Sequence, residues 1–163
     1  MLDAQLFFDG TVVPMTGAAL TTSRASTNVL DLLAGRDIGQ GIAYDQEIHV
    51  DVTNVFTAAG GATLQIQVQE APDAGGGTPG TFYTLIETDA IPVAGMTVGS
   101  RILRIAWPDI QLNYPATAEA TPPRYLRLNY LVSTGPFTAG ALLAYLSADR
   151  HEYLTYKANF VVA

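Results

Sequence analysis

The chain has 163 residues, a formal net charge of −7 and no cysteine, and only 14% of its residues are charged. This length suits one domain with a full hydrophobic core, and the lack of cysteine excludes disulfides, zinc–thiolate sites and a thiol nucleophile. The eight basic residues are scattered along the chain, so it has no basic face for phosphates and nucleic-acid binding is not expected.

Strand-like alternation is the main local signal, whereas helical periodicity is weak. In chain order, strands are predicted at 5–8, 28–32, 47–52, 63–70, 81–87, 101–107, 124–132 and 142–148. The pattern is clearest at 63–70, where Leu64, Ile66 and Val68 fall on one face and the glutamines fall on the other. One apolar and one polar face is typical of an antiparallel sheet. About eight strands separated by turns predict an all-β sandwich or barrel.

Glycine and proline mark the connections between these strands. The segment 72–80 contains three consecutive glycines and two prolines. Since glycine permits positive φ and proline cannot join a ladder, this pattern predicts a flexible loop between two strands. A second long connection runs over 112–123. No linker divides the chain, and one domain is predicted over 1–149.

Residues 150–163 follow the last predicted strand and differ from it in composition. This tail has two interpretations. It is either an added strand that closes a sheet edge or an arm that pairs with a neighbouring subunit.

The residue types that catalysis needs are present but not in catalytic patterns. His49 and His151 lack metal-ligand spacing, and His49, in an alternating strand, is expected to be structural or on the surface. The glycine-rich segment 35–41 lacks the Gly-Lys-Ser/Thr of a P-loop. Carboxylates such as Glu70 and Asp73 are expected on the solvated surface rather than paired across a glycosidase cleft. We therefore expect no enzyme activity, catalytic residue, metal or cofactor.

Several segments resemble the jelly-roll capsid cement (decoration) proteins of tailed phages, of the type known from a Bordetella podophage. The matching segments are the opening 2–8, ASTNVLDL at 25–32, GRDIGQG at 35–41, the strand 63–70, and 124–130 continuing through 135–140 into 142–146. The resemblance covers most of the chain up to Asp149. This chain is longer than the family at 112–121, and the tail after Arg150 does not match.

This resemblance implies an antiparallel jelly-roll β-sandwich that binds the outer surface of the major capsid shell. Such a subunit bridges neighbouring capsid subunits and stabilises the virion head. The implied partners are the major capsid protein and further copies of the chain, with a dimer favoured and a trimer possible, and neither nucleic acid nor a membrane. The first residues lack a signal peptide and no apolar run approaches the ~18 residues of a membrane span. We therefore expect assembly in the bacterial cytoplasm and a final location on the virion.

Aromatic residues are the candidate intersubunit or capsid contacts, namely Phe137, Tyr153, Tyr156 and Phe160. Phe137 has a second interpretation, in which it anchors a turn against the core.

A different class of function stays open beside the cement protein. The chain is alternatively a carbohydrate- or receptor-binding β-sandwich accessory protein. It would then stack sugars on loop aromatics such as Tyr83, Tyr114 or Phe137.

Overall fold

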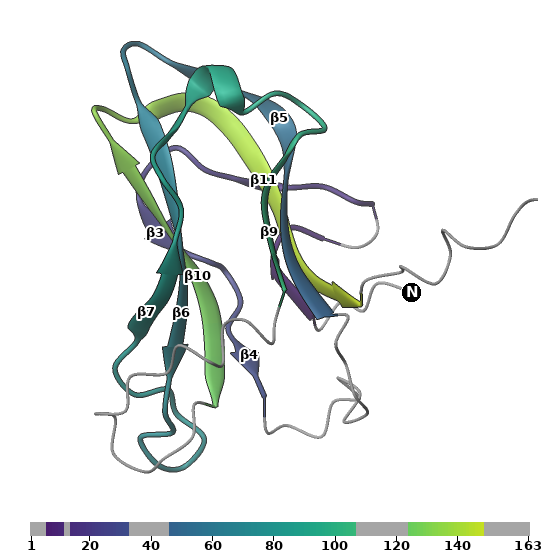
Figure 1. The fold of residues 1–163 in the computed structure, drawn as a ribbon, viewed down its shortest axis with the longest axis vertical. Coiled ribbons are helices and arrows are strands. Elements are labelled where there is room, and N and C mark those ends of the chain that lie inside the picture. Colours follow the sequence, from purple (N-terminus) through teal and green to yellow (C-terminus); the bar gives the residue numbers. More distant parts are fainter. Residues whose placement is uncertain (1–5, 12–13, 33–45, 107–123, 149–163) are drawn as a thin grey trace, which may run out of the picture.

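The computed structural model describes residues 6–11, 14–32, 46–106 and 124–148 (Figure 1). Within these ranges the chain forms β-strands and short 3-10 segments, among them η2 (Val93–Gly95). The strands are β1 (Phe7–Asp9), β2 (Ala18–Ala19), β3 (Arg24–Ala25), β4 (Leu30–Asp31), β5 (Gln46–Ala58), β6 (Thr63–Ala71), β7 (Tyr83–Glu87), β8 (Ile91–Pro92), β9 (Arg101–Ala106), β10 (Tyr125–Ser133) and β11 (Phe137–Ala148). The described residues contain no helix that could span a membrane.

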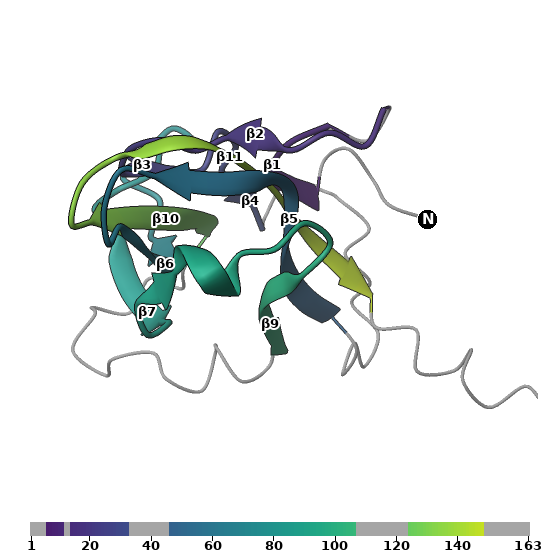
Figure 2. The same ribbon diagram turned by 90° about the horizontal axis from the view of Figure 1, so that it is seen from above.

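The strands form two sheets that face each other (Figures 1 and 2). One sheet has the order β1-β11-β5-β9, and β2 also pairs with β11. The other has the order β3-β10-β6-β7, with β4 also on β10 and β8 also on β6. Every pairing between described strands is antiparallel. The predicted all-β antiparallel sandwich is therefore confirmed.

The short strands share positions in the sheets. Strands β1 and β2 lie along successive parts of β11, β3 and β4 along β10, and β7 and β8 along β6. Each sheet thus has four strand positions, close to the predicted number of about eight. Each sheet also interleaves strands from the beginning and the end of the chain. The jelly-roll winding that the resemblance implies stays a prediction.

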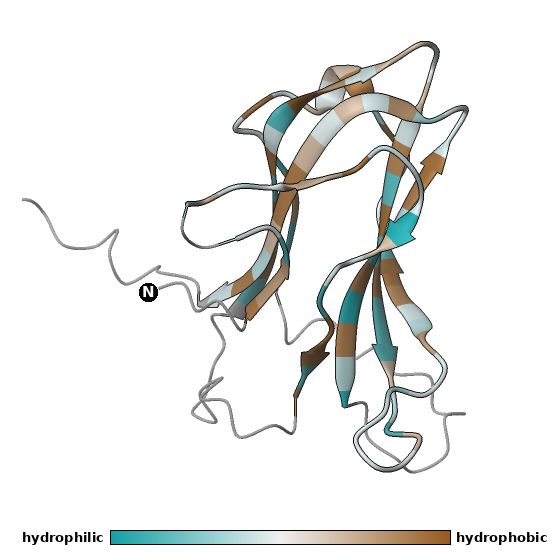
Figure 3. Cartoon of the chain, turned by 180° about the vertical axis from the view of Figure 1, so that it is seen from behind, coloured by the Kyte–Doolittle hydropathy of each residue, from teal (hydrophilic) through white to brown (hydrophobic). Residues whose placement is uncertain are grey.

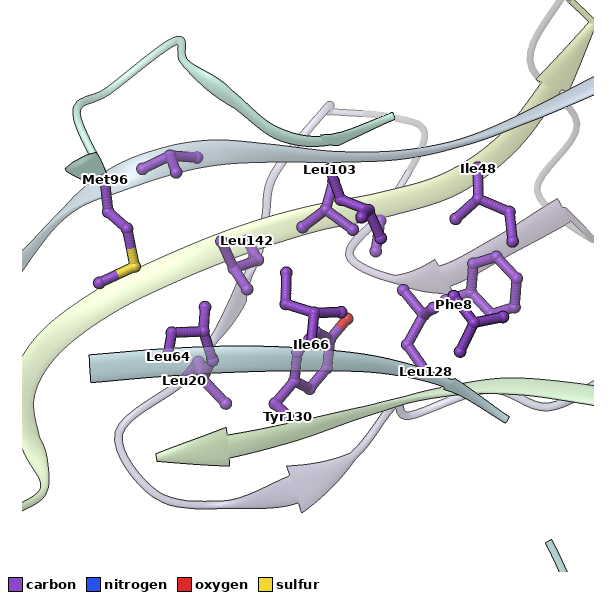
Figure 4. Close-up of a cluster of buried hydrophobic side chains, with 14 of the residues drawn as sticks. Phe8, Leu20, Ile48, Leu64, Ile66, Met96, Leu103, Leu128, Tyr130 and Leu142 are labelled. Atoms are coloured by element: carbon purple, nitrogen blue, oxygen red, sulfur yellow. The ribbon is translucent and has the colours of Figure 1, made fainter. Parts of the chain in front are cut away.

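The core lies between the sheets and follows the predicted alternation (Figure 4). Leu64, Ile66 and Val68 of β6 are each no more than 1% exposed, and Leu128 and Tyr130 lie fully buried beside them on the neighbouring strand β10. Facing positions of β5 and β11 complete the core from the other sheet. Full burial of one such side chain contributes about 1.5–3 kcal/mol, so the alternating faces supply most of the driving force for this packing.

Two strands extend beyond their predicted bounds. Strand β5 reaches Ala58 and β11 begins at Phe137, and their pairing shifts register between Phe137 and Leu142. Gly140 lies in this irregular stretch with φ +148°, and a Cβ there would come within 2.3 Å of the Phe56 ring. The absence of a side chain at Gly140 therefore lets the long strand pass over Phe56, as bulged strands do.

Candidate functional site

Polar side chains close one long edge of the sandwich. Asp9 of β1 is fully buried and accepts hydrogen bonds from Arg24 Nη1 at 3.0 Å and from Thr27 Oγ1 at 2.7 Å. The backbone N–H of Asn28 donates to the carbonyl oxygen of Phe8 at 2.9 Å. Because β1 and β3–β4 belong to different sheets, these bonds join the two layers. Buried and charge-assisted bonds of this kind indicate a structural role.

A second polar network lies on the outer face of the β9-β5-β11 sheet. Arg101 Nε donates to Asp51 Oδ1 at 2.8 Å, and the Tyr145 hydroxyl donates to Asp51 Oδ2 at 2.9 Å. Arg104 Nε donates to Glu47 Oε2 at 2.7 Å. These side chains point away from the core, since Ile48, Val50 and Val52 of β5 occupy the inner face. The network ties three neighbouring strands together.

His49 sits within this network and is 4% exposed. Its ring centroid lies 5.3 Å from that of Tyr145, and Nε2 is 3.4 Å from Glu47 Oε2. Burial, together with the charge of Arg101, lowers the pKa of His49, although Glu47 and Asp51 oppose the shift. The net shift favours the neutral ring. Of the two roles expected from the sequence, structural or on the surface, its burial supports the structural one.

A third cluster lies at the end of the sandwich where β4, β6 and β10 meet. Arg124 donates to both oxygens of Asp31, from Nε and Nη2, at 2.8 Å each, and from Nη1 to Asp73. These bonds, first those to Asp31, raise the pKa of Arg124. One guanidinium thus joins strand β4 and the loop after β6 to the start of β10.

Asp73 also organises the loop 72–80. Its Oδ1 accepts the backbone N–H groups of Gly75 at 2.9 Å and Thr78 at 3.2 Å, and the N–H of Gly80 donates to the carbonyl of Pro72 at 2.9 Å. The Gly75 amide, followed by Arg124, lowers the pKa of Asp73. The predicted loop between two strands is confirmed, and Gly75, Gly76 and Gly77 have the predicted positive φ in a turn that Asp73 holds closed.

Glu70 corrects a second expectation. The sequence placed it on the solvated surface, but it is 2% exposed, because it continues the inward phase of Leu64, Ile66 and Val68 along β6. Neither carboxylate oxygen has a hydrogen-bond partner among the described residues. This burial raises the pKa of Glu70 to about 7. The alternation along 63–70 already places Glu70 on the same face as Leu64, Ile66 and Val68, so the sequence contained the signal for its burial.

The structure describes one of the four predicted contact residues. Phe137 is 2% exposed and meets the Phe56 ring edge-on, with centroids 5.0 Å apart. It therefore anchors the turn against the core, as its second interpretation holds, and leaves little surface for a partner. Tyr153, Tyr156 and Phe160 lie outside the described residues.

The three aromatic residues proposed as sugar contacts in the alternative function differ in their exposure. Tyr83 is 52% exposed at the start of β7, Phe137 is buried, and Tyr114 lies outside the described ranges. A sugar platform needs exposed rings, so Tyr83 is the one of the three that the structure presents on a surface.

These sites define an all-β sandwich whose polar clusters join strands and sheets. Among the described residues, no three His, Asp or Glu side chains are placed to hold a metal ion. The family model described as Bbp16 matches residues 15–146, so the chain belongs to the Bbp16 family. The family's name suggests a protein of a Bordetella phage. No curated protein matches the chain.

Proposed function

We propose that this chain is a capsid cement protein. It binds the outer surface of the major capsid shell, bridges neighbouring capsid subunits and stabilises the phage head. The observation that carries the proposal is the match to the Bbp16 family over residues 15–146, which includes both sheets apart from β1 and the end of β11.

The architecture supports a binding subunit of this kind. A closed sandwich with cross-linked layers presents fixed surfaces, and little conformational entropy is then lost on docking. A standard interface buries roughly 1,600 Å² in total. A subunit that grips two capsid proteins gains further affinity through effective concentration, so each separate contact needs only modest strength.

Cosedimentation tests this function directly. Purified protein is mixed with expanded empty capsids of its own phage and pelleted, and an unrelated acidic β-sandwich protein serves as the control. We expect saturable recovery of the chain with the capsids and none of the control. Recovery no greater than that of the control overturns the proposal.

The tail gives a second test, of how the subunits associate. Deletion of 150–163 removes Tyr153, Tyr156 and Phe160 together. If these residues are intersubunit contacts, sedimentation velocity will show a smaller species than the full chain. An unchanged oligomeric state would assign the tail to the other interpretation, an added strand of its own subunit.

The exposed ring of Tyr83 supports one alternative function, that of a carbohydrate-binding accessory protein. A glycan array would show binding that disappears in Tyr83→Ala. Binding to capsids together with an empty array would exclude this alternative.

A further inference from the structure

Four loops meet at one end of the sandwich, drawn at the top of Figure 1. They connect β2 to β3, β5 to β6, β8 to β9 and β10 to β11. Their neighbourhood follows from strand pairing, since Thr63 lies opposite both Pro92 and Ser133. The Phe137 N–H donates to the Thr21 carbonyl at 2.9 Å. We call this region the uncharged end and define it as residues 20–23, 53–62, 92–100 and 133–140.

The uncharged end has no Asp, Glu, Lys, Arg or His in any of its four segments. With 14% charged residues in the chain, about four would be expected in segments of this combined length. The whole formal charge of −7 therefore lies elsewhere in the chain. In Figure 3 the loops at this end are mostly pale or brown.

The surface of the uncharged end is aliphatic and hydroxyl-rich. Val55 is 60% exposed and Val98 is 55% exposed. Around them lie exposed Thr, Ser, Gly, Ala, Asn and Pro residues, and the uncharged end has about twenty exposed residues in all. A standard interface uses roughly 20–30 residues on each side, so the uncharged end is large enough for one.

Hydrogen bonds to neighbouring segments and packing against the core hold the loops of the uncharged end in place. Thr57 Oγ1 and Thr138 Oγ1 share a hydrogen bond of 2.7 Å, and the Gly99 N–H donates to the Val52 carbonyl at 2.8 Å. Met96, 1% exposed, packs into the core below. Such a surface needs little ordering when a partner docks.

Two other described surfaces carry ions, whereas the uncharged end carries none. The outer face of the β9-β5-β11 sheet carries the Arg101–Asp51 and Arg104–Glu47 pairs, and the opposite end carries Arg124 with its two aspartates. A partner that covers those surfaces must desolvate ions. Interface cores are depleted of charged residues, and the uncharged end meets this condition without desolvating any ion.

We propose that the uncharged end is the surface that docks on the capsid shell, against a shell surface that is itself uncharged. This inference rests on the proposed cement function and adds the orientation of the subunit. A charge on either valine would then be buried without a partner on docking, which weakens binding. A charge elsewhere on the surface would not.

The test introduces one negative charge at two positions of equal exposure. Val98→Asp changes the uncharged end, and Met15→Asp is the matched control, because Met15 is also 55% exposed but lies in the hairpin between β1 and β2. Val98→Thr changes the same position without adding charge. Affinity for expanded empty capsids is measured by cosedimentation, after circular dichroism shows that each variant is folded.

We expect Val98→Asp to bind at least tenfold more weakly than the native chain, and both Met15→Asp and Val98→Thr to bind within about twofold of it. Val55→Asp should repeat the loss. Native-like binding of both Val98→Asp and Val55→Asp overturns the orientation while leaving the cement function intact. A native chain that binds no capsids overturns both. If Val98→Asp alters the oligomeric state in sedimentation velocity but not capsid binding, the uncharged end joins copies of this chain and the inference is wrong.

Discussion

The two ends of the sandwich use polar groups in opposite ways. The uncharged end satisfies its loops with backbone and hydroxyl bonds and exposes Val55 and Val98. The opposite end, which we call the charged end, is built from Arg124, its two aspartates and the buried Glu70. Ions join distant segments at the charged end, as they do along the long edge and on the outer face of the β9-β5-β11 sheet, whereas the uncharged end uses none.

The largest expected effect concerns the core beneath the uncharged end. Phe137→Ala removes a ring packed against Phe56 and should lower the free energy of unfolding by about 3–5 kcal/mol. Chemical denaturation measures this change. Unchanged stability combined with lost capsid binding would contradict the anchoring role and restore Phe137 as a contact residue.

Glu70 gives the next effect, at the charged end, and it depends on pH. The pKa of about 7 in the folded chain lies above the ordinary 4.5 of the unfolded chain. The cost of ionising Glu70 is therefore absent below pH 4.5 and grows as the pH rises to about 7. Glu70→Gln should thus be more stable than the native chain at pH 8, by up to ~3 kcal/mol relative to the same comparison at pH 4.

Denaturation series at pH 4, 6 and 8 measure the Glu70 effect. Glu87→Gln, which changes an exposed glutamate of β7, serves as the control. The same pH dependence in both variants would show that Glu70 is hydrated rather than buried.

Arg124 tests whether the ions of the charged end hold the loop 72–80. Arg124→Met removes the bonds to Asp31 and Asp73, so the amides of Thr78 and Gly80 should exchange with deuterium faster. Arg124→Lys should restore little of the protection of these amides, because an ammonium cannot bind a carboxylate through two parallel N–H groups. Native exchange rates in Arg124→Met would show that Asp73 closes the loop without help.

The smallest effect on stability belongs to the surface of the uncharged end. Val98 lies on an exposed loop, so Val98→Asp should change the free energy of unfolding by no more than about 0.5 kcal/mol. Thermal melts beside the capsid-binding assay would then show a loss of binding without a loss of fold. A large fall in melting temperature would instead mean that Val98 packs more closely than its exposure suggests.

Much of the fold could be predicted because its signal is local. The predicted strand at 63–70 agrees with β6 within one residue, and 124–132 agrees with β10 to the same degree. The lengths of β5 and β11 were underestimated, since their continuation depends on the bulge at Gly140 and its packing on Phe56. The predicted strand at 28–32 shrinks to Leu30–Asp31, because β3 and β4 share one edge of β10.

The side of each clear strand that faces the core follows from the sequence alone, because side chains alternate along a strand with a period of two whatever its neighbours are. The tertiary structure alone decided which ions meet. Arg124 is separated from Asp31 by 93 residues and from Asp73 by 51, and no local pattern links such distant positions. It also decided that four uncharged segments meet at one end, because strand pairing rather than sequence distance makes them neighbours.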